Sequence, residues 1–169
     1  VMLHGFPESW FSWRHQFAPL AAAGYHVVAP DMRGYGESDK PSDISAYNQV
    51  EVVNDVKGLV AALGYDTAIV IGHDWGGPTA WSCALWHPEI FSAVGVLSVP
   101  LTPLSPVPPL DAMKAFFKGQ FFYQLYFQTP GVAEAEFEKD VRTALRKFYH
   151  MASGELDLST LTEKSADDD

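Results

Sequence analysis

The sequence predicts an α/β fold, in which a parallel sheet carries flanking helices. Short apolar runs with strand character alternate with helical patterns through residues 1–98, and this alternation is typical of consecutive βα units. Residues 72–77 add a glycine-rich turn between one such run and a helix. Residues 99–169 carry no strand pattern, so the sheet is expected to lie within the first part of the chain.

Four runs rich in β-branched and other apolar residues are expected to form the strands. They cover residues 1–3, 25–29, 68–71 and 93–97. The patterns between them predict helices at about residues 13–23, 51–63 and 78–87. Ligands of a parallel sheet bind beyond the carboxyl ends of its strands, so the residues that directly follow these runs are the first candidates for a site.

The chain changes character after residue 98. Residues 99–110 contain prolines at positions 100, 103, 106, 108 and 109, which excludes a helix or an interior strand and predicts an extended connector. Beyond it, residues 110–128 and 132–151 have helical patterns, with Pro130-Gly131 as a break between them. The predicted organisation is a sheet-forming core at 1–98, a connector at 99–110 and a helical region at 111–169.

The turn at residues 72–77, Gly-His-Asp-Trp-Gly-Gly, has the form of a nucleophile elbow with aspartate in the nucleophile position. A strand-like run precedes the turn and a helical pattern follows it, which is the context that the motif requires. Glycines suit the turn because strand and helix approach closely around a strained residue. A simpler interpretation is that Asp74 only caps the following helix.

Two further segments favour a catalytic role for Asp74. Residues 4–7, His-Gly-Phe-Pro, follow the first predicted strand and form the kind of loop that supplies an oxyanion-hole N–H group. The backbone N–H groups of Phe6 and Trp75 would then converge on one oxygen. Residues 31–38, Asp-Met-Arg-Gly-Tyr-Gly-Glu-Ser, follow the second predicted strand and complete the same order of elements.

Together with residues 123–131, Tyr-Gln-Leu-Tyr-Phe-Gln-Thr-Pro-Gly, these segments resemble the soluble-type epoxide hydrolases of the α/β-hydrolase superfamily. The resemblance runs nearly end to end. It implies an α/β-hydrolase fold in which residues 1–98 are part of the core and residues 111–169 are the first part of a helical lid, or cap. It also implies hydrolysis of a small apolar epoxide by water to a vicinal diol, with no cofactor.

The resemblance assigns roles to individual residues. Asp74 is the nucleophile that forms a covalent ester, Phe6 and Trp75 frame the oxyanion hole, and Tyr123 is one of two lid tyrosines that hold the epoxide oxygen. The expected substrate pocket is lined by Phe6, Trp75, Gln124 and Phe127. Aromatic side chains at such spacing usually pack a helix against a core, so the role of Tyr123 rests on the resemblance.

The family pattern also contains a histidine base and a supporting acid downstream of the lid. The chain's histidines do not match that position, and His4 and His73, which belong to the two loop motifs, are expected to serve loop architecture. The chain is therefore expected to be an internal fragment that lacks part of the catalytic set and is inactive alone.

Two other functions compete with epoxide hydrolysis. Haloalkane dehalogenases use the same aspartate elbow, but many place a halide-binding asparagine where this chain has Phe6, and they do not need a tyrosine such as Tyr123. The second alternative is a truncated product without catalytic activity.

The composition of the chain limits its expected binding partners and cellular location. The net charge of −10 disfavours nucleic acid and anionic membrane surfaces. No apolar run approaches membrane-spanning length and no signal peptide is visible. The single cysteine, Cys83, is expected to be a buried thiol, which predicts a reducing, cytoplasmic location. No residues have metal-ligand spacing, and a homodimer is left open.

Overall fold

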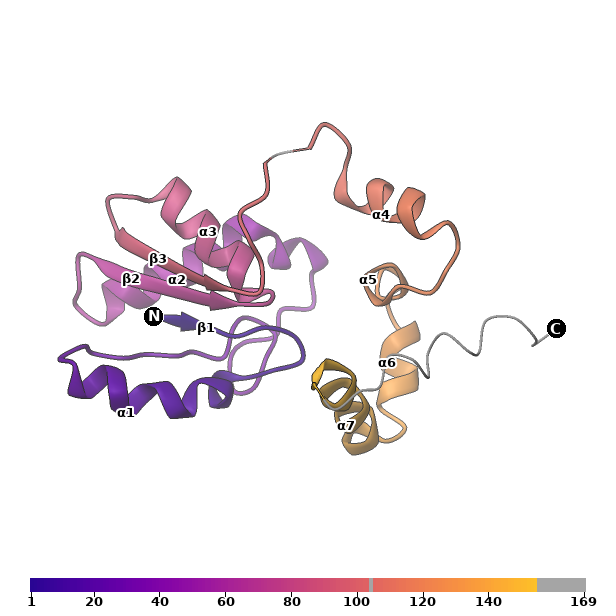
Figure 1. The fold of residues 1–169 in the computed structure, drawn as a ribbon, viewed down its shortest axis with the longest axis horizontal. Helices are drawn as coiled ribbons and strands as arrows, with labels where there is room; N and C mark the ends of the chain where they lie inside the picture. The colour runs from indigo at the N-terminus through magenta and orange to yellow at the C-terminus, as the bar shows by residue number, and fades with distance from the viewer. Residues whose placement is uncertain (104, 155–169) are drawn as a thin grey trace. The chain divides into compact units, whose positions relative to one another are not determined.

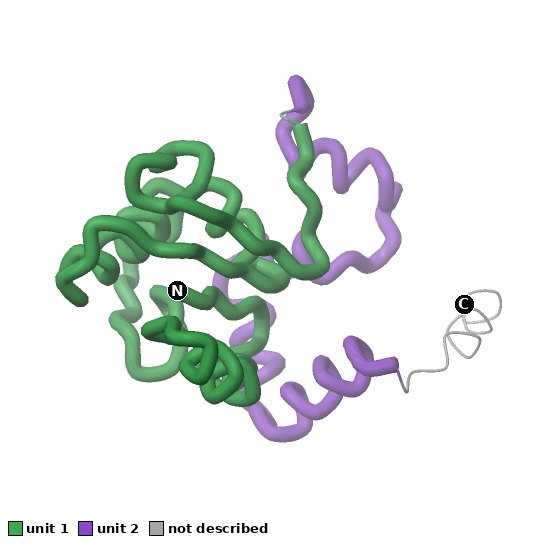
Figure 2. The backbone as a smooth tube through the Cα atoms, turned by 60° about the vertical axis from the view of Figure 1, so that its left-hand side comes forward, with its two compact units in different colours: residues 1–103 green, residues 104–169 purple. Residues whose placement is uncertain are grey.

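The computed structural model describes residues 1–103 and 105–154. The chain forms two compact units, unit 1 (Val1–Pro103) and unit 2 (Leu104–Asp169), which Figure 2 shows in different colours. The division falls within the predicted connector, residues 99–110. Residues 155–169 of the predicted lid lie outside the described residues.

Unit 1 contains a parallel sheet with the strand order β1-β2-β3 (Figure 1). The strands are β1 (Met2–Leu3), β2 (Ala68–His73) and β3 (Phe91–Leu97). Because the register pairs Leu3 with Gly72 and His73 with Leu97, the carboxyl ends of all three strands meet at one edge. The parallel sheet with flanking helices confirms the predicted α/β class.

One predicted strand is wrong, because residues 25–29 do not form a strand. The Met2 N–H donates to the Val28 carbonyl at 2.8 Å, which places this segment beside β1. However, this single backbone hydrogen bond does not make a ladder, so the segment is not a strand of the sheet. The other predicted strands are present, although β2 runs on to His73 and β3 begins earlier, at Phe91.

The helices of unit 1 follow the predicted pattern. They are η1 (Trp10–Trp13), α1 (Arg14–Ala22), η2 (Ile44–Tyr47), α2 (Gln49–Ala62) and α3 (Gly76–Trp86), the η elements being 3₁₀ helices. Asn48 caps α2, since its side chain accepts from the Glu51 N–H at 3.1 Å. α3 contacts all three strands and also α2, so these two helices cover the part of the sheet that carries the elbow.

The core of unit 1 lies between the sheet and the helices α2 and α3. Helix α2 contributes Val53, Val56 and Val60, whose spacing puts them on one helical face. They pack with the other members of the buried cluster, Leu3, Val70, Ala80, Cys83 and Phe91. Cys83 is fully buried with a free thiol, as predicted. The core therefore sits directly beneath β1 and β2, which hold the two loops of the candidate site.

Unit 2 is helical but more interrupted than predicted. Its helices are α4 (Pro109–Phe117), α5 (Tyr123–Tyr126), α6 (Val132–Phe137) and α7 (Val141–Ala152). The continuous helices predicted at 110–128 and 132–151 are wrong, because Lys118 ends α4 in a left-handed conformation (φ 47°) and Asp140 caps a new helix, α7. None of the helices among the described residues combines the length and apolar character needed to cross a bilayer.

Candidate active site

The elbow holds Asp74 in a strained backbone conformation between β2 and α3. Asp74 has φ 49°, in the left-handed region that few residues other than glycine adopt. The Gly77 N–H donates to the Asp74 carbonyl at 2.9 Å and closes the turn. Gly76 lies so close to the backbone of Leu3 that an added Cβ would collide with the Leu3 carbonyl. The strand-turn-helix context that the sequence predicted is therefore present around Asp74.

The loop after β1 brings a backbone donor to this carboxylate. The Phe6 N–H donates to Asp74 Oδ1 at 2.8 Å. Gly5 lies against Asp74, and a Cβ at that position would collide with the Asp74 side chain. Trp75 is the residue before the first turn of α3, where backbone N–H groups lack partners within the helix. Phe6, Asp74 and Trp75, which the sequence singled out, thus meet at one edge of the sheet.

His4 anchors the loop after β1, which the sequence predicts to be the oxyanion loop, to the segment that follows residue 30. Its side chain is buried, with 1% of its surface exposed. Its Nε2 accepts from the Met32 N–H at 2.9 Å, and its Nδ1 lies 2.9 Å from the Gly5 carbonyl. The first contact makes Nε2 an acceptor, which leaves Nδ1 to donate to the Gly5 carbonyl. His4 is accordingly a structural link between two loops.

A second link, which the sequence did not reveal, joins the loop after β1 to the elbow. Glu8 Oε2 lies 3.2 Å from His73 Nδ1 and 3.3 Å from the Gly5 nitrogen. Glu8 thereby contacts both the residue before Asp74 and the residue before Phe6. Its position next to the His-Gly-Phe-Pro motif was the only available signal, because its partner is 65 residues away.

Tyr35 is a further residue of the site that the sequence did not identify. Its ring meets His4 edge-on, with 4.7 Å between ring centroids. Burial, and secondarily the negative charge of Asp74, raise the pKa of Tyr35 to about 12. Tyr35 therefore remains a neutral phenol in the electrostatic field of Asp74.

A second strained residue follows β3. Ser98 has φ 71° and comes directly after Leu97, whose register partner is His73. The left-handed residues Asp74 and Ser98 thus follow paired positions of neighbouring strands. Backbone strain of this kind gathers at functional sites.

Unit 2 presents the predicted lid tyrosine in a state suited to donation. The Tyr123 hydroxyl oxygen accepts from Gln124 Nε2 at 2.9 Å, so its own hydrogen is not used in that bond. Tyr126, which the resemblance leaves unassigned, donates to Glu136 Oε2 at 2.5 Å. This bond raises the pKa of Tyr126. Both hydroxyl groups have a partner within the unit, but only Tyr126 uses its hydroxyl hydrogen in the bond described.

Several aromatic residues of unit 2 line a groove of about 430 Å³. Tyr123 and Phe127 lie in its wall, together with Phe121, Tyr126, Phe137 and Phe148. Gln124 contributes through its bond to Tyr123. The predicted pocket residues therefore form two sets, one at Asp74 in unit 1 and one at this groove in unit 2.

Neither of the larger cavities, both in unit 1, contains the elbow. The larger, about 590 Å³, lies at the amino ends of β1 and β2 and is lined by residues such as Val1, Tyr25 and Ile69. Ligands of parallel sheets bind at the carboxyl ends of the strands. The candidate site is therefore placed at Asp74, although the larger cavity lies elsewhere. Among the described residues, no three His, Cys, Asp or Glu side chains gather in a way that suits a metal ion.

Comparison with known proteins gives a consistent set of relatives. A family model described as the alpha/beta hydrolase fold matches residues 1–164. The chain is 46% identical over 147 residues to Epoxide hydrolase A of Mycobacterium tuberculosis, a match that covers 87% of this chain and 46% of that protein. It is 47% identical over 149 residues to Bifunctional epoxide hydrolase 2 of Sus scrofa, covering 88% of this chain and 26% of that protein.

A solved structure agrees with these relatives. An epoxide hydrolase from an endophytic Streptomyces is 50% identical, with a TM-score of 0.90 over 92% of this chain and 47% of that one. The chain thus spans about half, or less, of the length of these relatives.

Proposed function

The chain belongs to the α/β-hydrolase fold family, and we propose that it carries the nucleophile and a lid tyrosine of an epoxide hydrolase. The named relatives, at 46 to 50% identity, support the substrate class. The observation that carries the proposal is the hydrogen bond from the Phe6 N–H to Asp74 Oδ1. This donor is aimed at the oxygen on which negative charge develops when an aspartyl ester is hydrolysed.

The first step is ring opening by Asp74. Oδ1 is engaged by the Phe6 N–H, so Oδ2 is the oxygen that attacks a ring carbon. The carbon–oxygen bond of the epoxide breaks and an alkyl ester forms on Asp74. The leaving alkoxide takes a proton from the Tyr123 hydroxyl, and because an alkoxide is far more basic than a phenolate, this transfer runs downhill.

The second step is hydrolysis of the ester at the aspartate's own carbonyl carbon. Water attacks that carbon, and the oxyanion that forms on Oδ1 is held by the N–H groups of Phe6 and Trp75. By the resemblance, a histidine downstream of the lid takes the proton from this water. The tetrahedral intermediate collapses with cleavage of the ester carbon–oxygen bond, and the leaving diol oxygen takes the proton back from the histidine. The proton of the resulting Asp74 carboxyl group returns to the Tyr123 phenolate, so the products are the vicinal diol and free Asp74. In this proposal, residues 1–98 belong to the catalytic core, 99–110 connect it to the lid, and 111–169 begin the lid.

Oxygen isotope labelling tests this function in the full-length protein that carries the chain. A single turnover of an aryl epoxide in H₂¹⁸O should place ¹⁸O in the peptide that contains Asp74, because water attacks the aspartyl carbonyl. Asp74→Ala should abolish turnover, whereas Asp66→Ala, at an exposed position before β2, should not. Direct attack of water on the epoxide would instead place the label in the diol during the first turnover, and that result would disprove the proposal.

A further inference from the structure

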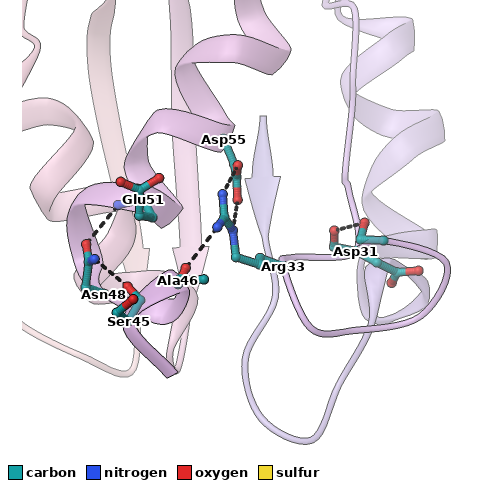
Figure 3. A network of polar contacts seen from close by, with 8 residues as sticks. Asp31, Arg33, Ser45, Ala46, Asn48, Glu51 and Asp55 are labelled. Atoms are coloured by element: carbon teal, nitrogen blue, oxygen red, sulfur yellow. Dashed lines mark hydrogen bonds and ion pairs between the residues drawn. The ribbon is translucent and has the colours of Figure 1, made fainter. Parts of the chain in front are cut away.

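A bidentate ion pair clamps the loop after residue 30 to helix α2 (Figure 3). Arg33 Nε donates to Asp55 Oδ2 at 2.7 Å, and Arg33 Nη2 donates to Asp55 Oδ1 at 2.6 Å. Arg33 Nη1 also donates to the Ala46 carbonyl at 2.9 Å. The guanidinium is thus fixed in three directions by α2 and η2. Paired N–H···O bonds of this kind define an orientation that a lysine cannot reproduce.

A continuous series of contacts connects this clamp to the oxyanion donor. Met32, the neighbour of Arg33, donates its N–H to His4 Nε2 at 2.9 Å, and His4 Nδ1 lies 2.9 Å from the Gly5 carbonyl. The next residue, Phe6, donates its N–H to Asp74 Oδ1 at 2.8 Å. Each link is a direct bond or a step to the next residue along the chain.

The same two segments are tied together at a second point. The Trp10 N–H donates to Asp31 Oδ1 at 2.9 Å, so residues on both sides of the oxyanion loop bind residues 31 and 32. The position of the loop therefore depends on the position of residues 31–33. Met32 packs against the core cluster to which α2 contributes, and the Arg33 side chain adds directional hydrogen bonds from this segment to α2.

The contribution of the clamp to stability is modest. The Arg33 and Asp55 side chains are 18% and 45% exposed, and a partly exposed ion pair adds appreciably to stability only where its geometry is well defined, as in a bidentate pair. Orientation is what a two-pronged contact adds. An oxyanion donor acts only when it is held at the correct point before the charge develops. A contact that fixes the orientation of residues 31–33 therefore helps to hold the Phe6 N–H in place.

We propose that Arg33 and Asp55 are positioning residues that hold the Phe6 N–H on Asp74 Oδ1. The inference rests on the proposed function, because it assigns the donor to ester hydrolysis. Loosening the clamp lets the donor drift from Oδ1. Ester hydrolysis then slows, while ring opening, which uses the other oxygen, proceeds at nearly the same rate.

The test uses Arg33→Lys in the full-length protein, which keeps the charge and loses the two-pronged geometry. Pre-steady-state kinetics with an aryl epoxide should show ester hydrolysis slowed about 10-fold, less than the loss on removing a donor outright. The rate of ring opening should stay within about two-fold of that in the unmodified protein, so the ester on Asp74 accumulates. Asp55→Ala should have the same effect. The amide proton of Phe6 should also move upfield in NMR spectra recorded without substrate.

Asn48→Ala is the matched control. Asn48 belongs to the same polar network (Figure 3), where it caps α2 and bonds the Ser45 carbonyl without touching residues 31–33. It should reduce stability and leave the ratio of the two rates unchanged. The inference is overturned if Asn48→Ala gives the same selective loss, if Arg33→Lys slows both steps equally, or if the Phe6 amide shift does not move. Absence of any ester in the unmodified protein would refute the proposed function, whereas the Phe6 shift reports on the clamp separately.

Discussion

The two carboxylate oxygens of Asp74 differ in their surroundings. Oδ1 accepts the Phe6 N–H at 2.8 Å, and the left-handed backbone at φ 49° fixes the direction in which the side chain leaves the elbow. A carboxylate that is free to rotate would present either oxygen to a substrate. The local packing of Gly5 against Asp74 restricts that freedom, so under the proposed mechanism this geometry assigns attack to Oδ2 and the oxyanion to Oδ1.

Gly5→Ala tests this close approach. The added Cβ would collide with the Asp74 side chain, so the oxyanion loop must move and the Phe6 N–H loses its position. Ester hydrolysis in the full-length protein should fall by a factor on the order of 10²–10³, the usual loss for one oxyanion donor. Gly58→Ala is the control, because that α2 residue has open space around it and alanine is the better helix former. Equal rates in Gly5→Ala and the unmodified protein would contradict the assignment.

The two tyrosines of α5 should differ in their effect on ring opening. Tyr123→Phe removes the hydroxyl whose hydrogen is not used in its bond with Gln124, and we expect alkylation to slow by about 10²–10³ without a change in ester hydrolysis. Tyr126→Phe removes a hydroxyl already bonded to Glu136 and should do much less. Pre-steady-state kinetics separates the two steps. A large effect of Tyr126→Phe alone would show that the assignment is inverted.

At the residue scale, the sequence predicts contacts within short motifs better than contacts between residues that are far apart along the chain. The contact between Phe6 and Asp74 could be expected because each residue lies within a contiguous motif. Glu8, Tyr35 and Ser98 could not be predicted, because their significance comes from partners on other segments, such as the contact of Glu8 with His73, 65 residues away. Such pairings exist only once the sheet has brought its carboxyl ends together.

At the scale of elements, the ends of helices and strands carry information that periodicity does not. The predicted helix at 110–128 breaks into α4 and α5 because Lys118 caps α4 in a left-handed conformation. Glycine or asparagine usually occupies such a cap, so it could not be predicted from a lysine. The predicted helix at 132–151 breaks at Asp140, where an acidic residue in an otherwise helical pattern acts as a cap. Apolar spacing located the helical region correctly and missed both interruptions.

The end of β3 stores strain that glycine should release. Ser98→Gly removes the Cβ that makes φ 71° unfavourable, and the gain should exceed the entropic cost of glycine by about 0.5–1 kcal/mol. Chemical denaturation measures the difference. Ser92→Gly, within the same strand at ordinary φ, should instead destabilise by about 0.5–1 kcal/mol. A loss of stability in both variants would argue that the serine hydroxyl outweighs the backbone strain.

The start of α7 should respond to acid. Bonds from the Thr143 hydroxyl and N–H hold the pKa of Asp140 below its ordinary value. A carboxyl group with a lowered pKa in the folded state contributes stability above its unfolded pKa, and this contribution is lost as the pH falls through the folded value. Carbon chemical shifts of α7 should therefore report fraying below about pH 4. Asp140→Asn, a neutral cap, should remove that pH dependence, and fraying that persists in this variant would point to another group.

At the scale of the whole molecule, burial is distributed unequally between the two units. The buried cluster of Leu3, Val53, Val70 and their neighbours belongs to unit 1. In the described residues 105–154 of unit 2, Ala133 alone is buried, and large aromatic side chains such as Phe116 and Phe121 are 80% and 77% exposed. The sequence predicted which part forms the sheet, but the apolar content of residues 111–151 gave no sign that so little of it would be buried within its own unit.

Amide hydrogen-exchange rates should differ between the two units in the same way as burial. Amides that open only when a buried core is disrupted exchange slowest, and helices with little buried surface open at lower free energy. Amides of β2 and α3 should therefore be the best protected, and those of α4–α7 should exchange at a lower opening free energy. Leu3→Ala, at a position with no exposed surface, should lower the opening free energy of the β2 amides by about 2–5 kcal/mol. Exchange in α6 and α7 as slow as in β2 would mean that unit 2 owes its order to contacts other than its own buried residues.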